Sequence, residues 1–375
     1  MTGVSERTHF DAPSLAGARE VEDLLDRLEL GLFLPGSVTS FLGRNDNWAG
    51  ETTSGQKIFV KKLKVPSGTA RSGVQRTLVF QRLLERIPRE MLLAPDLLGW
   101  DEDSGVLVFR LLDGARTGAE RMVDETFDES LALAAGRAVG ALHRCDPSGL
   151  VVDDSPCPLP STALLQGLSP LAFDECSFAG LQAWRLLQQD TAVIDAVAAL
   201  LEEERAAPKV PAHCDLRLDQ FLISDEQVWL TDWEEFRLAD AARDVGSFAG
   251  EWLFRSILDI VTTRGDSQSR GDTSFADVSL THETVIARGV AKFERLRPVI
   301  EAFCRGYREA RPVVDEGLAR RAAGFAGWHL LDRLIAGADM SARLSATARA
   351  AAGVGRNILL TPEAFIATLG LEGVS

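Results

Sequence analysis

Residues 213–223 read HCDLRLDQFLI, and residues 228–234 read VWLTDWE. Each stretch contains a short apolar run, and the SDEQ segment between them is typical of a turn. The pattern predicts two strands joined as a β-hairpin. Gln220 lies directly before the first apolar run and Asp232 lies just after the second, so we expect their polar groups at one end of the hairpin, near Asp215.

These residue types suit phosphoryl transfer. One carboxylate can accept the proton of an attacking hydroxyl, while an amide oxygen and a second carboxylate can hold magnesium against nucleotide phosphates. His213, Asp215, Gln220 and Asp232 have the spacing of the kinase catalytic loop and its metal-binding aspartate. A chance hairpin with surface carboxylates is the alternative interpretation.

The chain resembles the aminoglycoside phosphotransferase and choline kinase-like superfamily, which is related to protein kinases. The resemblance rests on the H-x-D loop, on the D-W-E of residues 232–234 and on AGRAVGALH at 135–143, which is similar to a helix ending in Leu-His. It implies an α+β, two-lobed protein-kinase-like fold. A small β-sheet N-lobe would cover residues 1–112, and a mainly helical C-lobe would cover residues 113–375.

The resemblance also implies roles for the motif residues. Asp215 would act as the catalytic base, and His213 would brace the loop by hydrogen bonding. Gln220 and Asp232 would bind Mg²⁺, although the family pattern has asparagine where this chain has the longer Gln220.

Two acidic residues near the hairpin complete the predicted C-lobe site. Asp244, in the LADAARDVG segment of residues 238–246, would hold the catalytic loop from behind, or would cap a helix N-terminus. Glu234 could reach a second metal ion or the acceptor. His143 is interpreted as a packed core residue, because a lone histidine on an apolar helix face is usually structural.

The N-lobe contains candidate residues for binding ATP. The KIFVKKL of residues 57–63 resembles the strand whose lysine pairs with the α and β phosphates, and Lys61 fits better than Lys62. Residues 43–52, GRNDNWAGET, are predicted to form the loop over the phosphates. Arg44, Asn45 and Asn47 are expected to contact the phosphates there.

Two further contacts of the N-lobe are predicted. The VLVFRLLDG of residues 106–114 resembles the strand that enters the hinge, so backbone groups of Arg110 to Leu112 would bind adenine. The helix that follows Lys61, expected over residues 73–87, has Glu85 as its single acid and therefore as the candidate partner of that lysine.

The rest of the chain is predicted to be mainly helical. Helices are expected over residues 128–143, in two pieces before residue 205, and over residues 245–263, 281–307, 314–336 and 341–353. The polar stretch at residues 264–274 is too polar to join a core and is expected to be mobile.

Composition limits the other function classes. The formal net charge of −15, from 40 basic and 55 acidic residues, argues against nucleic acid as a partner. The five cysteines are scattered and odd in number, which predicts free thiols in a cytoplasmic protein. No apolar run reaches the roughly 20 residues of a membrane helix.

The acceptor is interpreted from resemblance alone. The GRNDNWAG, FVK and DLRLDQ motifs look like those of the phosphotransferases of class V lanthipeptide and thioamitide biosynthesis. Such kinases phosphorylate Ser or Thr of a ribosomal precursor peptide, and a partner lyase or cyclase follows. The alternatives are a small-molecule kinase for an aminoglycoside, amino alcohol or sugar hydroxyl, and a non-catalytic pseudokinase-like binding protein.

Overall fold

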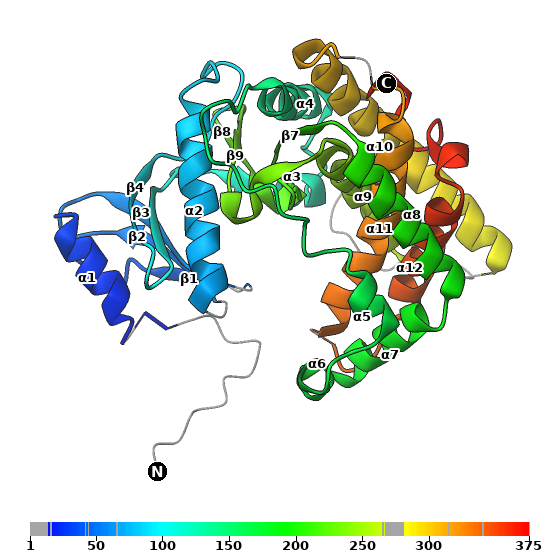
Figure 1. The fold of residues 1–375 in the computed structure, drawn as a ribbon, viewed down its shortest axis with the longest axis horizontal. Coiled ribbons are helices and arrows are strands. Elements are labelled where there is room, and N and C mark those ends of the chain that lie inside the picture. The colour runs from blue at the N-terminus through cyan, green and yellow to red at the C-terminus, as the bar shows by residue number, and fades with distance from the viewer. Residues whose placement is uncertain are drawn as a thin grey trace.

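The computed structural model describes residues 14–374 except residues 16, 42, 44, 65–66, 265, 267–280, 314 and 340. A small sheet-bearing region and a larger helical region lie side by side, with helix α2 between them (Figure 1). This arrangement confirms the predicted α+β architecture.

The N-terminal region is built on an antiparallel five-stranded sheet in the spatial order β1-β2-β3-β5-β4. Its apolar core joins one face of the sheet to α1, through residues such as Val21, Leu24, Trp48 and Val60. The elements of this region are α1 (Arg19–Arg27), β1 (Thr39–Phe41), β2 (Asp46–Glu51), β3 (Lys57–Lys62), α2 (Ser67–Leu84), β4 (Leu97–Asp101) and β5 (Val106–Arg110).

Residues 43–52 correct the prediction of a long phosphate loop. Residues 46–51 form strand β2, which pairs with β3 so that Trp48 lies opposite Val60. The polar and glycine-rich composition suggested a loop, but burial of Trp48 in the sheet core favours a strand. The connection left between β1 and β2 is residues 42–45, of which residues 42 and 44 lie outside the described residues.

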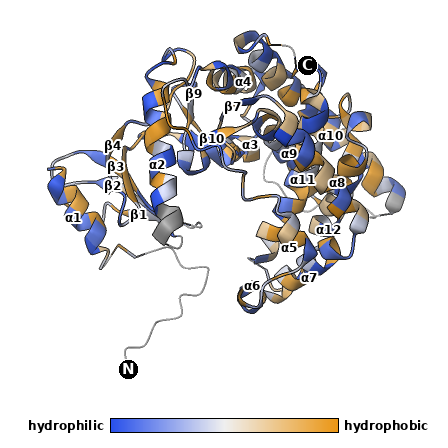
Figure 2. Cartoon of the chain, viewed as in Figure 1, coloured by the Kyte–Doolittle hydropathy of each residue, from blue (hydrophilic) through white to orange (hydrophobic). Residues whose placement is uncertain are grey.

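Helix α2 contributes to the cores of both regions. Val74 packs with Leu63 and Leu107 of the sheet, whereas Phe80 and Leu83 belong to the core of the C-terminal region. The half of α2 nearest the C-terminal region is the more apolar half in Figure 2. The division at residue 112 stays a prediction, because the two cores interleave along this helix.

The C-terminal region is mainly helical, as predicted. Helix α10 packs along α4, and α11 packs along α9 and α12. The helices of this region are α3 (Gly118–Val123), α4 (Glu129–Arg144), α5 (Thr162–Gln166), α6 (Pro170–Glu175), α7 (Phe178–Gln188), α8 (Thr191–Ala206), α9 (Ala242–Leu258), α10 (His282–Ala310), α11 (Leu318–Asp339) and α12 (Ala346–Leu360).

Short strands and single 3₁₀ turns complete this region. The two-stranded sheet pairs β10 with β7, and the three-stranded sheet has the order β6-β8-β9. The strands are β6 (Arg116–Thr117), β7 (Lys209–Ala212), β8 (Phe221–Ser224), β9 (Gln227–Leu230) and β10 (Arg237–Asp240). The 3₁₀ turns are η1 (Leu218–Gln220), η2 (Trp233–Glu235), η3 (Asp259–Val261), η4 (Pro362–Phe365) and η5 (Glu372–Val374).

The predicted hairpin is confirmed as β8 and β9. Phe221 pairs with Leu230 and Ser224 pairs with Gln227. Asp225 and Glu226 between them have φ values of 50° and 58°, the positive φ pair that a two-residue type I′ turn requires.

Helices α4 and α10 approach closely because two glycines face the partner backbone. A Cβ atom at Gly136 would lie 2.0 Å from the carbonyl oxygen of Phe303, and one at Gly306 would lie 2.0 Å from that of Leu133. Any side chain at either position would push the helices apart. This contact matters for the site because α4 carries His143 and α10 carries Tyr307.

The remaining predicted helices are present, but they begin and end at residues that differ from the prediction. The largest shift is at α12, which ends at Leu360 rather than at residue 353, and α2 begins at Ser67 rather than at residue 73. Most of the polar stretch at residues 264–274 lies outside the described residues. Across the described part of the chain, no helix combines the length and the apolar character that crossing a bilayer requires.

Candidate active site

The catalytic loop begins where strand β7 ends, and a single carboxylate holds it. The backbone amides of His213 and Cys214 donate to the two oxygens of Asp244 at 2.7 and 2.8 Å. Asp244 lies in the first turn of α9, but its side chain caps no helix amide. The predicted contact between Asp244 and the catalytic loop is present, and the alternative role as an N-cap is excluded.

A buried chain of hydrogen bonds orients this carboxylate. Arg311 donates to the Tyr307 hydroxyl, which lies 3.0 Å from Nδ1 of His143, while Nε2 of His143 lies 2.9 Å from Asp244. Because a carboxylate only accepts, Nε2 carries the proton and Nδ1 accepts from the tyrosine. His143 is therefore buried in the core, as predicted, and its ring links Tyr307 to Asp244.

The protonation states in this network are set by burial and by charge. Burial raises the pKa of Tyr307, so its hydroxyl keeps the proton that it donates. Burial also acts to raise the pKa of Asp244, but the hydrogen bonds from His143 and from the backbone amide of His213 outweigh it and leave that pKa below its ordinary value. Asp244 is thus an ionised acceptor of three hydrogen bonds.

The ring of His213 joins the loop to the hairpin. Its Nε2 donates to the Thr231 carbonyl at 2.8 Å, and its Nδ1 accepts the backbone amide of Asp215 at 3.3 Å. The Gln220 carbonyl accepts the amide of Thr231 at 3.0 Å. Thr231 precedes Asp232, so the loop and the predicted metal-binding residues are held together at one end of the hairpin.

Two non-glycine residues of this site have left-handed backbones. Cys214 has a φ of 65° and Asp232 a φ of 68°. Aspartate tolerates this conformation better than cysteine does, and each such residue costs on the order of 1 kcal/mol. For Cys214, the contact of its amide with Asp244 offsets part of that cost. Strain of this kind is often found at functional sites.

Lys61 is buried and has two carboxylate partners. It forms ion pairs with Asp232 and with Glu234, the latter at 2.8 Å. Burial acts to lower the pKa of Lys61, but the two carboxylates outweigh it and raise that pKa, so the ammonium stays charged. The same pairing lowers the pKa of the partly buried Asp232, against the effect of burial.

The predicted phosphate-loop residues have structural contacts. The amide nitrogen of Asn45 donates to both oxygens of Glu234 at 3.1 and 2.9 Å, and its oxygen accepts the amide of Lys64. Asn47 lies in β2, and its side chain donates to the Asn45 carbonyl at 3.4 Å. Arg44 lies outside the described residues, so its phosphate contact stays a prediction.

Glu85 is not the partner of Lys61. It lies beyond the end of α2 and is exposed. The amide of Arg110 donates to the Asp96 carbonyl, and its guanidinium pairs with the Asp96 carboxylate. The predicted adenine contacts of the backbone from Arg110 to Leu112 stay a prediction.

A small pocket of about 110 Å³ opens beside Asp215. Its walls come from the loop after α4, from the catalytic loop and from α11, which supplies Trp328 and Asp332. Arg217 also lines it. Burial acts to lower the pKa of Arg217, but Asp215 and Asp219 raise it, so the guanidinium stays charged. The pocket is the natural place for an acceptor.

No sequence pattern pointed to these pocket residues. Cys157 and Trp328 are far from the catalytic motif along the chain and carry no spacing signal. The Cys214 thiol donates to the Cys157 sulfur and thereby lowers the pKa of Cys157, while burial raises the pKa of Cys214. All five cysteines are free thiols, as predicted.

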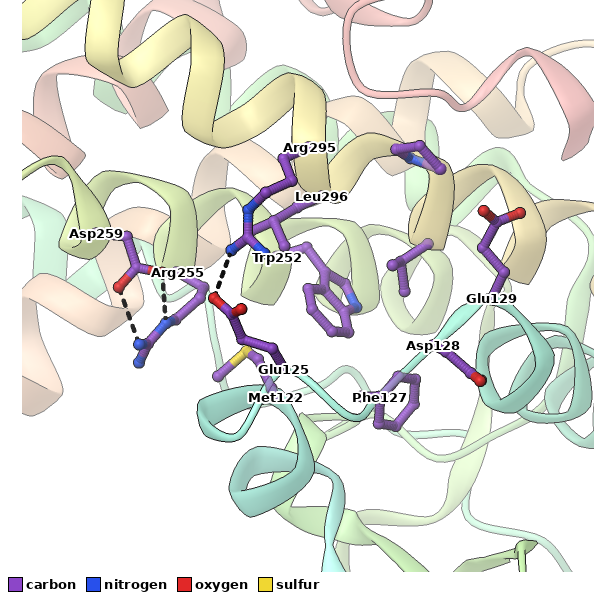
Figure 3. A pocket seen from close by; sticks show the side chains of 12 residues that line it. Met122, Glu125, Phe127, Asp128, Glu129, Trp252, Arg255, Asp259, Arg295 and Leu296 are labelled. Carbon is purple, nitrogen blue, oxygen red and sulfur yellow. Dashed lines mark hydrogen bonds and ion pairs between the residues drawn. The ribbon is translucent and has the colours of Figure 1, made fainter. Parts of the chain in front are cut away.

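A larger cavity, of about 240 Å³, lies elsewhere in the C-terminal region (Figure 3). Trp252 and Phe127 point into it, and two ion pairs lie at its edge, Glu125 with Arg295 and Arg255 with Asp259. It contains none of the catalytic-loop or hairpin residues. The smaller pocket, in contrast, is lined by Cys214, Asp215 and Arg217 of the predicted catalytic loop.

Comparison with known proteins agrees with this geometry. The sequence model of the phosphotransferase enzyme family matches residues 43–275, more than half of the chain. No curated protein sequence matches the chain significantly.

Among solved structures, amicoumacin kinase hAmiN, in complex with AMP-PNP, Ca²⁺ and Ami, aligns with a TM-score of 0.52 and 14% identity, over 93% of this chain and 96% of that one. The macrolide 2′-phosphotransferase of Brachybacterium faecium aligns with a TM-score of 0.47 and 17% identity, over 92% and 98% of the chains. The aminoglycoside phosphotransferase APH(2″)-Ib, bound to ADP, has a TM-score of 0.47 and 15% identity, over 93% and 99%.

The match to amicoumacin kinase confirms the kinase-like fold. The family model covers the catalytic loop, the hairpin, Lys61 and Asp244. The chain belongs to the phosphotransferase enzyme family and is a phosphotransferase that acts on a hydroxyl group.

Proposed function

We propose that this protein is an ATP-dependent kinase in which Asp215 deprotonates the acceptor hydroxyl. The observation that carries the proposal is the position of Asp215, which lines the small pocket while its loop is fixed by Asp244 and by the hairpin. A base must lie within hydrogen-bond reach of the proton it removes, and a fixed loop keeps it there.

The oxygen ligands available beside Lys61 suit Mg²⁺. Asp232 offers a carboxylate and Gln220 an amide oxygen at the same end of the hairpin. The described residues contain no cluster of three His, Cys, Asp or Glu that could hold a metal by itself. Mg²⁺ commonly binds through one or two carboxylates together with substrate phosphates. When bound, the ion would neutralise charge on the phosphates.

Different residues of the chain would then have different roles in phosphoryl transfer. Lys61 would bind the nucleotide phosphates, and Asp215 would accept the proton of the acceptor hydroxyl. The acceptor oxygen forms a bond to the γ-phosphorus while the bond from that phosphorus to the β-phosphate oxygen breaks, and ADP leaves. Arg217, beside Asp215 at 3.5 Å, would offset negative charge in the pocket.

We propose a Ser or Thr side chain of a precursor peptide as the acceptor. Besides the motif resemblance to lanthipeptide and thioamitide kinases, the pocket volume of about 110 Å³ supports this choice. Sites for drug-sized ligands usually enclose at least about 300 Å³, whereas a single side chain needs less. Most of the acceptor would then lie outside the pocket.

Exposed apolar side chains on α6 and α7 also support a peptide as the acceptor. Helices α6 and α7 expose Leu171, Phe173 and Phe178 by 68%, 55% and 67%. Ser177, which caps α7, donates to the carbonyl of Ala338 in α11, the helix that also supplies Asp332 to the pocket. An acceptor with apolar residues beside the modified hydroxyl could cover these side chains.

A small-molecule hydroxyl is the second candidate. The supporting observation is the fold shared with amicoumacin kinase, whose structure contains AMP-PNP, Ca²⁺ and Ami. The test is mass spectrometry after incubation with ATP and Mg²⁺, using one pool of Ser/Thr-rich precursor peptides and one of aminoglycosides and amino alcohols. One added phosphate on a peptide supports the first candidate, and one on a small molecule replaces it with the second. Transfer to neither pool, with ATP bound, would favour a non-catalytic binding protein.

A further inference from the structure

Helix α2 cannot supply a carboxylate to Lys61. Its eighteen residues, Ser67–Leu84, include no aspartate or glutamate. Where α2 meets the metal-binding turn η2, it presents Gly73 and Arg76. A buried lysine without a nearby negative charge would be costly, so the charge must come from another element.

Glu234 supplies that charge from η2. Its carboxylate lies 2.8 Å from Nζ of Lys61, and the side chains of the two residues are 9% and 8% exposed. Asn45 donates to both carboxylate oxygens, and Arg76 of α2 donates to the backbone carbonyl of Glu234. The carboxylate is therefore held by Asn45 and by Lys61 of β3, while α2 holds the backbone of the same residue.

The packing of α2 leaves room for this arrangement. A Cβ atom at Gly73 would lie 2.8 Å from Cδ1 of Leu63 and 3.6 Å from Cβ of Glu234, so the helix lies close over the turn. The rings of Phe80 and Trp233 stack with centroids 3.4 Å apart and an interplanar angle of 9°. These contacts hold η2 against α2 on both sides of Glu234.

We infer that Glu234 is the positioning residue of the nucleotide-binding lysine, in place of a glutamate on α2. This inference rests on the proposed function and assigns Glu234 to Lys61 rather than to a second metal ion or to the acceptor. Lys61 has two acidic partners, and Asp232 is the one that the metal would need. Glu234 would keep Lys61 in place when Asp232 turns to the metal.

This arrangement also has a consequence for α2. Where a helix carries the acid, movement of that helix makes or breaks the ion pair. Here the ion pair depends on η2, which directly follows Asp232. The lysine and the metal-binding aspartate are thus positioned by one short segment.

The test is a double-mutant cycle on nucleotide affinity. ATP dissociation constants would be measured by calorimetry, with Mg²⁺ and with EDTA, for wild type, Glu234→Gln, Lys61→Met and the double variant. If Glu234 acts through Lys61, each single change weakens binding by about tenfold, and the double variant is no weaker than Lys61→Met within about twofold. The loss for Glu234→Gln should persist in EDTA.

Three results would overturn the inference. Additive losses in the double variant would mean that Glu234 acts independently of Lys61. A loss confined to the Mg²⁺ condition would make Glu234 a metal ligand. A loss of the same size for the matched control Glu85→Gln, an exposed acid just beyond α2, would show that any acid in this region matters.

Folding and the proposed function are checked separately. Thermal unfolding of each variant identifies a folding failure. If Glu234→Gln does not fold, Glu234→Asp replaces it, because it keeps the charge but withdraws the carboxylate by one methylene; an unchanged affinity for ATP would then overturn the inference. A wild-type protein that binds no ATP would overturn the proposed function and this inference together.

Discussion

The predicted catalytic loop and Lys61, the lysine proposed to bind the nucleotide, are both held by buried carboxylates, but in different ways. Asp244, which holds the loop, has a fully buried side chain and bonds to partners that all belong to the C-terminal region. Lys61 and Glu234 belong to different regions, and Asp232 between them is 21% exposed. The first network lies within one core, whereas the second spans two.

We expect the Asp244 network to hold the loop in the same way with or without a ligand, whereas a bound ligand can change the partners of Lys61. The hydrogen bonds of the Asp244 network lie within the protein, so they do not depend on a substrate. Removing one partner would leave buried polar groups without hydrogen bonds, which is costly. Around Lys61, nucleotide phosphates and a metal can replace existing partners. We therefore expect changes in the first network to lower stability, and changes in the second to lower nucleotide affinity.

The largest effect is expected from Asp215→Asn, which tests what the fixed loop is for. The amide cannot accept the acceptor proton, so kcat should fall about 10²–10⁴-fold, while the dissociation constant for ATP stays within about twofold. Calorimetry and a phosphate-transfer assay measure the two quantities. Asp219→Asn, in the same loop but half exposed, is the matched control. Wild-type turnover by Asp215→Asn would contradict the proposed mechanism.

Asp232→Asn tests the network that spans both regions. The change removes a predicted metal ligand and one partner of Lys61, so the affinity for Mg²⁺-ATP should fall at least about tenfold. Stability should change little, because Glu234 still pairs with Lys61. Binding titrations at several Mg²⁺ concentrations measure the effect. Unchanged affinity at every concentration would exclude Asp232 as a metal ligand.

Asp244→Asn should act mainly on stability. The loop amides lose an ionised acceptor, and unfolding free energy should fall by about 2–4 kcal/mol. The pKa of Asp244 lies below its ordinary 3.8 in the folded state, so its contribution is present above about pH 4 and lost as pH falls further. Denaturant unfolding from pH 7 to pH 3 should therefore show the variant and wild type converging in acid. A constant difference would contradict this.

Gln220→Asn should have the smallest effect. It restores the residue of the family pattern and keeps an amide oxygen, so the Mg²⁺ concentration for half-maximal activity should change by less than about tenfold. Gln220→Ala, which removes that oxygen, should raise this Mg²⁺ concentration by more than Gln220→Asn does. Equal behaviour of the two variants would show that the amide oxygen of Gln220 does not bind the metal.

The hairpin and its neighbours could be predicted because their signals are local. The apolar runs, the turn and the offsets of Asp215, Gln220 and Asp232 all lie within twenty residues, where strand periodicity fixes relative positions. The resemblance extended this to Lys61 and Asp244. The loop prediction was wrong for residues 46–51, because burial of Trp48 against the sheet outweighed a composition typical of loops.

The sequence by itself determined the hairpin, the acidic and amide groups around it, and the lysine on its strand, because each depends on neighbours along the chain. Only the tertiary structure decided that Asn45 would bind Glu234, 189 residues away, and that α11 would wall the pocket beside Asp215. Such pairs form because two cores pack in one particular way. No spacing in the sequence records that packing, so the partner of Lys61 could be found only in the folded molecule.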